Sequence, residues 1–565
     1  MRPLSPPYDT IAAGLATPID LDGTTLLANR LLTKDFAFPL DERDAFGLNG
    51  LLPDRVMSID EQVELEMERL HRKESPLERY IGLAALQDRN ATLFYRVLAE
   101  NLEELLPIVY TPTVGEACQE FSHVLRRTRG TWITPADVDR IPEILRNGPF
   151  DDVRLIVVTD NERILGLGDL GAGGMAIPIG KLALYTGACG IYPALTLPVS
   201  LDVGTDNPDL LADPLYIGHR EPRLRGAAYD RLVDAFVDGV SEVWPGCVIQ
   251  WEDFKQHNAL RILDRYRDRV PSFNDDVQGT AAVVLGGILA ATRHLGQPLA
   301  AQRVLLVGAG AAGIGIGRLI RAELADAGMP PAEIERRLLF VDSRGLVHAD
   351  REDLDDSKRP LAVGAAFAAE TGLAPGSELL SVVEAYRPTI LVGTTGVAGT
   401  FSEDVVRAVA AAVDRPLVMP LSNPTSIAEA RPVEILAWSD GRAIVASGSP
   451  FPPVDGTVIG QANNVFVFPG IGLGTIVSGA RRITDEMILA AARTLAGHVT
   501  ADHFAAGSIY PPIAALRSVS RAIAVSVAEE AIRSGLAPAA DTLEADVDAA
   551  MWWPDYVPYR RARPR

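Results

Sequence analysis

The chain has 565 residues, of which 47% are hydrophobic and 22% charged, a composition typical of a soluble globular protein with several domains. Its net charge of −21 disfavours nucleic acid as a partner, because binding to phosphates requires clustered basic side chains. An anionic substrate would therefore need a local basic pocket.

The cysteines and the apolar stretches indicate the cellular compartment of the protein. Cys118, Cys189 and Cys247 are odd in number and lack CxxC spacing, which favours a reducing compartment without disulfides. The N-terminal residues show no signal-peptide pattern. The charge-free apolar run from Thr280 to Thr292 is too short to span a membrane. We expect a cytoplasmic protein without a membrane partner.

The N-terminal part of the chain is predicted to be helical. Apolar side chains recur at helical spacing over residues 57–106, after a capping box formed by Ser58 and Glu61. The following stretch PIVYTPTVG (107–115) contains two prolines and a glycine, so it predicts a break in the helices. Tyr110 is thereby expected in a turn.

From about residue 153 the pattern changes to short β-rich runs that alternate with helical segments. Residues 153–160, 196–207 and 247–254 each predict a buried strand that ends at acidic residues. The glycine-dense run 166–180 predicts a tight loop, followed by a helix that begins near Lys181. This alternation predicts a parallel α/β sheet, in which ligands collect at the carboxyl ends of the strands.

A glycine-rich turn begins a nucleotide-binding pattern. The strand VLLVG leads into the GxGxxG turn of Gly308, Gly310 and Gly313, and a helix follows. The glycines would allow a tight turn, and the helix N-terminus would bind a pyrophosphate. A GxGxxG pattern by itself also occurs in unrelated glycine-rich turns, so the context of strand and helix matters.

The next strand, 338–345, carries Asp342, which would bind ribose hydroxyls and repel a 2′-phosphate. Asp342 lies 29 residues beyond Gly313 instead of about 20. We attribute the difference to an inserted turn and short helix at 329–335. Lys358 and Arg359 lie close enough in sequence to offer a 2′-phosphate a competing cationic site.

Acidic residues flank the junction between these two patterns. Glu252 and Asp253 follow a predicted strand, and Asp276 lies in FNDDVQG (273–279), ahead of a small apolar helix expected to pack against a sheet. Taken singly, each acid is typical of a solvated surface. Together, without histidine or cysteine, they would offer oxygen-only coordination, which suits Mg²⁺ or Mn²⁺ better than zinc.

Three further side chains belong to no motif. By composition alone, Lys181 could be an ordinary surface lysine and Tyr110 an ordinary packed tyrosine. Lys181, however, lies in an apolar helix, where a charge is costly. Arg163, next to the apolar run ILGLG, could clamp a carboxylate through two parallel hydrogen bonds. A surface ion pair is the simpler explanation of Arg163 by itself.

Over nearly its whole length the sequence resembles the malic enzymes of the long bacterial and mitochondrial type. The resemblance rests on ordered blocks, namely SPLERYIGLAALQDRNATLFYRVL, PIVYTPTVG, TDNERILGLGDLG, GKLALYTGACGI, QWEDF, FNDDVQGTAAV, GAGAAGIG, LSNPT and GQANNVFVFPG. That family decarboxylates L-malate oxidatively to pyruvate and CO₂, using NAD(P)⁺ and Mg²⁺ or Mn²⁺.

The resemblance implies a role for each matching residue. Lys181 in GKLALY matches the general base, Tyr110 in VYTPTVG the general acid, and Asp275 the acid that assists the lysine. The implied metal ligands are Glu252, Asp253 and Asp276. The implied substrate-binding residues are Arg163, Asn423, Asn463 and Asn464. The implied cofactor-binding residues are Arg163, Asp276, Gly308, Gly310, Gly313, Asp342 and Asn423.

The implied architecture is α/β, with a Rossmann-type NAD-binding domain inserted in a two-segment α/β substrate domain and a helical N-terminal domain. The expected boundaries are 1–127 for the helical domain, 128–275 and 464–535 for the substrate domain, 276–463 for the NAD-binding domain, and 536–565 for a C-terminal tail. The resemblance also implies a homotetramer built as a dimer of dimers.

NAD⁺ is the expected cofactor because of Asp342. Two alternatives to malic-enzyme chemistry share the same sequence features. A malolactic enzyme uses this scaffold to convert malate to lactate with NAD bound throughout. A catalytically silent NAD-binding regulator is also conceivable, but the complete set of catalytic residues disfavours it.

Overall fold

The computed structural model describes residues 16–164 and 166–562, and the chain folds into two compact units. Unit 1 comprises Met1–Ile249, Ile476–Gly479 and Ala540–Arg565, and unit 2 comprises Gln250–Thr475 and Ala480–Ala539. The finer division into four domains expected from the sequence stays a prediction, and its first fifteen residues lie outside the described part. Within the described ranges, none of the helices is long and apolar enough to cross a membrane.

The N-terminal helices of unit 1 confirm the helical prediction. They are α4 (Ile59–His71), α5 (Pro76–Arg89), α6 (Ala91–Glu100) and α7 (Leu102–Val109). The capping box at Ser58 is confirmed, because its hydroxyl accepts from the Glu61 amide at 3.1 Å and the Glu61 carboxylate accepts from the Ser58 amide at 2.8 Å. α7 continues through Pro107, so the break in the helix falls at Tyr110, not at the first proline.

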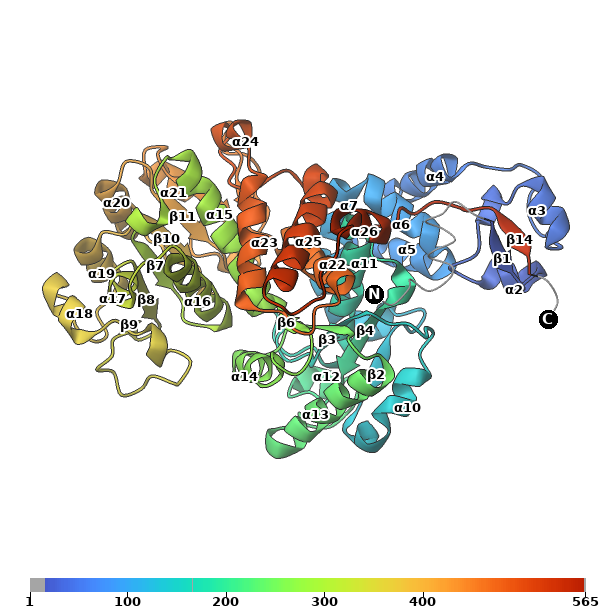
Figure 1. Ribbon diagram of the computed structural model, residues 1–565, viewed down its shortest axis with the longest axis horizontal. Coiled ribbons are helices and arrows are strands. Elements are labelled where there is room, and N and C mark those ends of the chain that lie inside the picture. The colour runs from blue at the N-terminus through green and yellow to red at the C-terminus, as the bar shows by residue number, and fades with distance from the viewer. Residues whose placement is uncertain (1–15, 165, 563–565) are drawn as a thin grey trace. The chain divides into compact units, whose positions relative to one another are not determined.

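The first and last strands of the chain lie side by side in unit 1 (Figure 1). β1 (Thr17–Ile19) pairs in parallel with β14 (Tyr559–Arg561), and α3 (Leu40–Ala45) packs against β14. A small separate core beside them contains Ile19, Leu26 of α2 (Gly23–Ala28), Phe38, Phe46 and Leu48. Within that core Lys34 forms a buried ion pair with Glu42 at 2.6 Å. The Lys34 ammonium also lies 4.0 Å from the centroid of the Tyr559 ring. This cation–π contact links the last strand of the chain to a residue near its N-terminus.

Unit 1 also contains a parallel sheet, as predicted. β2 (Thr131–Ile133), β4 (Thr196–Leu201) and β3 (Leu155–Thr159) are neighbours in that order. β5 (Val248–Trp251) begins beside β3, where the Val248 amide donates to the Arg154 carbonyl at 2.8 Å, and its last two residues start unit 2. The helices around this sheet are α8 (Thr113–Gln119), α9 (Phe121–Val124), α10 (Ile141–Arg146), α11 (Ala176–Cys189), α12 (Pro208–Ala212) and α13 (Gly226–Val243).

Helix α11 begins earlier than the sequence predicted. It starts at Ala176, after a 3₁₀ turn at Gly171–Met175, and Lys181 therefore lies in its second turn and not at its start. Nearly every residue of α11 is buried, because the helix packs against both β3 and β4. An apolar helix buried on all sides shows no polar stripe, which explains why its start was misplaced.

Unit 2 is organised around a seven-stranded sheet with the order β13-β12-β11-β10-β7-β8-β9. The strands predicted at VLLVG and at 338–345 are confirmed as β7 (Val304–Val307) and β8 (Leu338–Asp342), and the sheet also contains β9 (Gly345–Leu346), β10 (Ile390–Gly393), β11 (Leu417–Pro420), β12 (Ile444–Ser447) and β13 (Gly460–Gln461). All pairs are parallel except β8 with β9. β8 and β10 flank β7, so the chain reverses its direction of winding at β7, where such sheets bind ligands.

The helices of the sheet are α16 (Ala311–Asp326), α17 (Pro331–Glu335), α18 (Ala365–Thr371), α19 (Leu379–Tyr386), α20 (Glu403–Ala412) and α21 (Pro432–Trp438). α17 is the short inserted helix predicted between Gly313 and Asp342. Unit 2 also contains α14 (Gln256–Tyr266), β6 (Ser272–Asn274), which neighbours β5, and α15 (Thr280–His294). The C-terminal helices are α22 (Phe468–Ser478), α23 (Asp485–Gly497), α24 (Ala501–Ala505), α25 (Leu516–Arg533) and α26 (Leu543–Ala550).

The small residues of α15 serve contacts between helices. α15 packs closely against α16 and α23, whereas the sequence suggested a sheet as its neighbour. A side chain at Gly286 would come within 3.0 Å of Leu495 in α23, and one at Gly287 would overlap the Tyr510 hydroxyl. Small residues suit any close packing of backbones, so the pattern by itself did not identify the partner.

Candidate active site

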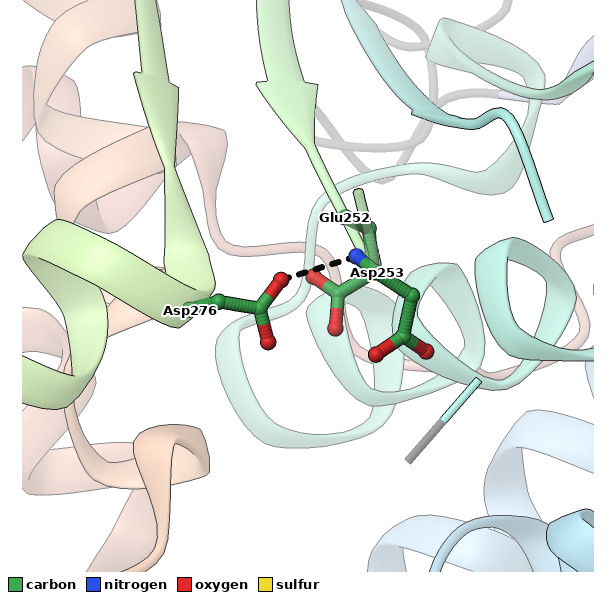
Figure 2. A group of neighbouring side chains, drawn as sticks. All are labelled: Glu252, Asp253 and Asp276. Carbon is green, nitrogen blue, oxygen red and sulfur yellow. Dashed lines mark hydrogen bonds between the residues drawn. The ribbon is translucent and has the colours of Figure 1, made fainter. Parts of the chain in front are cut away.

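Three carboxylates gather at the carboxyl ends of β5 and β6 (Figure 2). Glu252 and Asp253 directly follow β5, and Asp276 is the second residue after β6. One oxygen of each side chain lies within 4.8 Å of the others. The backbone amide of Asp253 donates a hydrogen bond to Asp276 Oδ2 at 2.8 Å. This hydrogen bond joins the two strand ends and brings together the three acids that the sequence singled out.

The backbone conformation of Asp253 explains how two neighbouring residues serve one cluster. Successive side chains of a regular strand point to opposite faces of the sheet. Asp253 has a φ of +57°, in the left-handed region that aspartate tolerates better than most residues. The chain therefore turns sharply at the end of β5, and the Glu252 and Asp253 carboxylates both lie close to Asp276 (Figure 2).

The cluster fits a hard divalent cation. Its donors are oxygen atoms only, and Glu252 and Asp253 are 2% and 3% exposed. Three carboxylates this close repel one another, and a divalent cation would relieve that repulsion. Gln250, which is fully buried, donates from Nε2 to Glu252 Oε2 at 2.7 Å and orients that ligand. Sequence reasoning missed Gln250, because an amide inside a strand carries no motif.

Asp275 lies beside the cluster and contacts another predicted residue. Asn464 Nδ2 donates to the Asp275 carboxylate and to its backbone carbonyl, each at 3.1 Å. A side chain on Gly279 would overlap Asp275 Oδ1, so only glycine permits this position of the carboxylate. Asn463 accepts from the Val465 amide at 3.0 Å and thereby caps the turn that presents Asn464.

In unit 1, Lys181 and Tyr110 are brought together by α11 and the end of α7. Lys181 Nζ lies 5.0 Å from the centroid of the Tyr110 ring, and the two residues are 2% and 7% exposed. Gly180 makes this approach possible, because a side chain there would come within 2.8 Å of the Val109 carbonyl. The structure thus brings together the two residues that the resemblance pairs as base and acid.

Arg163 lies on a loop that is held in place by a second, buried arginine, Arg223. Arg163 itself is exposed, whereas the Arg223 side chain is 1% exposed. Arg223 donates to the Asp160 carbonyl and, at 3.1 Å, to the Asp169 carboxylate, so it holds both ends of the loop. Burial raises the pKa of Asp160, while the positive charge of Arg223 opposes that rise. Arg223 was not predicted, because Asp169 and Asp160, the residues through which it holds the loop, are 54 and 63 residues away in sequence.

The glycine-rich turn has the conformation that its sequence predicted. Gly308 has a φ of +110°, and a side chain there would come within 2.7 Å of Thr394. A side chain on Gly313 would overlap the Gly308 carbonyl. Gly310 is the N-cap of α16, so the amides of the first helical turn are available to a phosphate.

Asp342 ends β8 as predicted, but its carboxylate already has protein partners. Arg351 donates to its two oxygens at 2.8 and 3.2 Å, and Lys358 donates to it at 3.0 Å. Burial opposes ionisation of Asp342, yet the hydrogen bonds from these cations lower its pKa overall. The cations that could attract a 2′-phosphate are therefore neutralised by the acid that would repel it. Asn423 follows β11 in a turn with a cis Asn423–Pro424 bond and is exposed.

The nucleotide-binding sheet and the carboxylate cluster together define a class of protein, an oxidoreductase that combines a dinucleotide with a divalent metal ion. Comparison with known families agrees. The model "Malic enzyme, N-terminal domain" matches residues 87–267, and "Malic enzyme, NAD binding domain" matches residues 277–532. The chain belongs to the malic enzyme family.

Individual relatives are similar over almost the whole chain. The NAD-dependent malic enzyme of Pseudomonas aeruginosa is 48% identical over 547 residues, which cover 95% of this chain and 97% of the relative. That of Sodalis glossinidius is 48% identical over 546 residues, with the same coverage. Among solved structures, the malic enzyme of Pyrococcus horikoshii matches with a TM-score of 0.54 and 26% identity over 80% of this chain and 89% of its own. The Entamoeba histolytica malic enzyme, at 24% identity and a TM-score of 0.56, covers 90% of this chain and 92% of its own and supports the fold.

Asp276→Asn is expected to lower the affinity for Mn²⁺ by more than the roughly 10–100-fold typical of losing an outer partner of a metal ligand, because it removes a ligand charge. Mn²⁺ binding to the purified protein can be measured by electron paramagnetic resonance without any substrate. Asp264→Asn, at a surface position whose side chain is 54% exposed, is the matched control. Unchanged Mn²⁺ affinity in the Asp276 variant would remove this residue from the metal site.

Proposed function

We propose that this protein catalyses the oxidative decarboxylation of L-malate to pyruvate and CO₂, with NAD⁺ as hydride acceptor. The observation that carries the proposal is the metal-type carboxylate cluster in a chain that also contains a buried lysine–tyrosine pair and a dinucleotide turn. The 48% identity to enzymes named NAD-dependent malic enzyme supports the choice of substrate and cofactor.

The bound groups supply chemistry that side chains lack. When bound, NAD⁺ would supply a hydride acceptor, and Mg²⁺ or Mn²⁺ would supply a Lewis acid for the negative charge developed during decarboxylation. Glu252, Asp253 and Asp276 would hold the metal ion, and Gln250 keeps Glu252 in the orientation to do so. Asp275, oriented by Asn464, assists the base.

Two residues move protons in this scheme. Lys181 Nζ removes the proton from the 2-hydroxyl of malate as the hydride leaves C2. Tyr110 later donates its phenolic proton to C3 of the enolate of pyruvate, which gives pyruvate. The 5.0 Å between Lys181 Nζ and the Tyr110 ring supports this pairing, because the proton taken by the lysine can return to the tyrosine and restore both groups.

Other residues bind and orient the reactants. The exposed guanidinium of Arg163 clamps a malate carboxylate, and Asn463 and Asn464 contact the same substrate. Asn423 contacts malate and the nicotinamide end of the cofactor. The turn at Gly308, Gly310 and Gly313 receives the pyrophosphate. The homotetramer and the cytoplasmic location expected from the sequence remain predictions.

Purified protein supplied with L-malate, NAD⁺ and Mn²⁺ is expected to form NADH and pyruvate in equal amounts, because no second hydride transfer follows decarboxylation. Absorbance of NADH and enzymatic assay of pyruvate and lactate measure this ratio. Lactate without net NADH would identify a malolactic enzyme. Unchanged malate would identify a silent NAD-binding regulator.

Lys181→Ala is expected to reduce malate oxidation by roughly 10²–10⁴-fold, the usual contribution of a general base. NAD⁺ affinity, measured by calorimetry, should persist, because Lys181 lies outside the glycine-rich turn. Lys73→Ala, another lysine of unit 1 away from the site, is the control. A folded Lys181 variant with near-normal turnover, or one that has lost NAD⁺ binding, would contradict the assigned role.

The wild-type protein is expected to prefer NAD⁺ over NADP⁺. Arg351 and Lys358 donate hydrogen bonds to the Asp342 carboxylate, so their charges are not available to bind the 2′-phosphate of NADP⁺. Asp342→Asn should raise the ratio of kcat/KM for NADP⁺ to that for NAD⁺ by about tenfold, since it frees Lys358 for a charge-assisted hydrogen bond to a phosphate, while Arg351 stays paired with Asp353 at 2.7 Å. The control is Asp350→Asn, at an exposed carboxylate close in sequence. A wild-type preference for NADP⁺ would refute the role given to Asp342.

A further inference from the structure

A carboxylate without a cationic partner lies beneath the loops that follow β10 and β11. Glu429 is 0% exposed, although glutamate is almost never fully buried unless it is paired. Within the described part of the chain, the side-chain partners of Glu429 are backbone amides and hydroxyls of Thr395 and Ser422, and no lysine, arginine or histidine is among them. Neither the helical pattern nor any catalytic motif accounts for a charge at this position.

The surrounding backbone and hydroxyl groups satisfy this carboxylate. Its Oε1 accepts from the Thr395 amide at 2.7 Å, from the Thr395 hydroxyl at 2.9 Å and from the Ser422 hydroxyl at 2.5 Å. Its Oε2 accepts from the Ser422 amide at 3.2 Å. The Ser422 hydroxyl in turn accepts from the Gly396 amide at 2.8 Å. The chain reserves space for this arrangement, because a side chain on Gly393 would come within 2.7 Å of the Glu429 side chain.

These contacts join two parts of the dinucleotide site. Thr395 follows Thr394, whose hydroxyl donates to the Gly308 carbonyl of the glycine-rich turn at 3.1 Å. Ser422 directly precedes Asn423, the residue assigned above to malate and the nicotinamide. One buried carboxylate thus holds the loop that supports the pyrophosphate turn together with the loop that carries Asn423.

We propose that Glu429 is a positioning residue for the reaction, which sets Asn423 relative to the nicotinamide end of NAD⁺ by bridging the loops after β10 and β11. The proposal rests on the function and on the role of Asn423 proposed above. Glu429 is 0% exposed and therefore has no surface to offer a cofactor or substrate; it acts through Ser422 and Thr395. A carboxylate suits this task because it only accepts hydrogen bonds, and all four groups that face it are donors.

Glu429→Gln is the sharpest test, because glutamine keeps the size of the side chain but points an NH₂ group at a donor. We expect kcat/KM for malate oxidation with saturating metal to fall by about 10–100-fold, the effect of a small misplacement of a reacting group. The KM for NAD⁺ should rise. Mn²⁺ affinity should stay within about twofold of the wild-type value, because the carboxylate cluster follows β5 and β6 and not these loops. Glu403→Gln, at an exposed glutamate of α20 paired with Arg407, is the control.

A double-variant cycle with Asn423→Ala distinguishes positioning from a general structural role. If Glu429 acts through Asn423, the Glu429→Gln change should cost little, within about twofold, once Asn423 is alanine. Losses that multiply in the double variant would overturn the proposal, as would wild-type kinetics for Glu429→Gln. Should that variant fail to fold, Ser422→Ala removes one of the same hydrogen bonds and takes its place in the cycle.

The same measurements separate failure of this inference from failure of the proposed function. Malate-dependent NADH formation that is impaired by Asn423→Ala but not by Glu429→Gln would overturn the inference alone. Absence of NADH formation by the wild-type protein would overturn the proposed function and the inference with it.

Discussion

The hydrogen bond from the Asp253 amide to the Asp276 carboxylate is the contact on which the candidate site depends. It joins two segments 23 residues apart and holds three carboxylates at a spacing that favours a divalent cation. Without a counter-charge these acids would repel one another. The left-handed backbone of Asp253 is part of the same arrangement, because it turns two successive side chains towards one point.

Groups that touch no reactant keep the functional side chains in place. Gln250 orients Glu252, Arg223 anchors the loop of Arg163, and Glu429 bridges the loops at the ends of β10 and β11. All three side chains are nearly or fully buried. Gln250 donates a hydrogen bond to Glu252, whereas Arg223 and Glu429 each form several hydrogen bonds. Burial makes such contacts strong, and it makes the loss of one partner costly. The precision of the site therefore derives from buried polar contacts as much as from the residues that perform chemistry.

At the end of β8, the acid expected in a dinucleotide-binding pattern is paired with basic side chains of the protein itself. Asp342 occupies the place of the acid that binds ribose, but it also neutralises Arg351 and Lys358. The preference for NAD⁺ proposed above consequently rests on a balance between this carboxylate and the two cations, of which Arg351 also pairs with Asp353. Unit 1 contains another lysine that pairs with an acid and also contacts a distant residue. Lys34 pairs with Glu42, and its ammonium lies against the ring of Tyr559 in the last strand, β14.

The sequence by itself determined the parallel α/β class, several strands, the glycine-rich turn and the acids of the candidate metal site, because these depend on local patterns and on the rule that ligands bind at strand ends. It also determined the family, through long ordered motifs that include Lys181 and Tyr110. Only the tertiary structure decided where α11 begins, which helices press against α15, and that Asp342 is already paired. It alone identified Gln250, Arg223 and Glu429 as supporting residues. Their partners come from other loops and strands, and hydrogen bonding between distant segments leaves no periodic trace in the order of the amino acids.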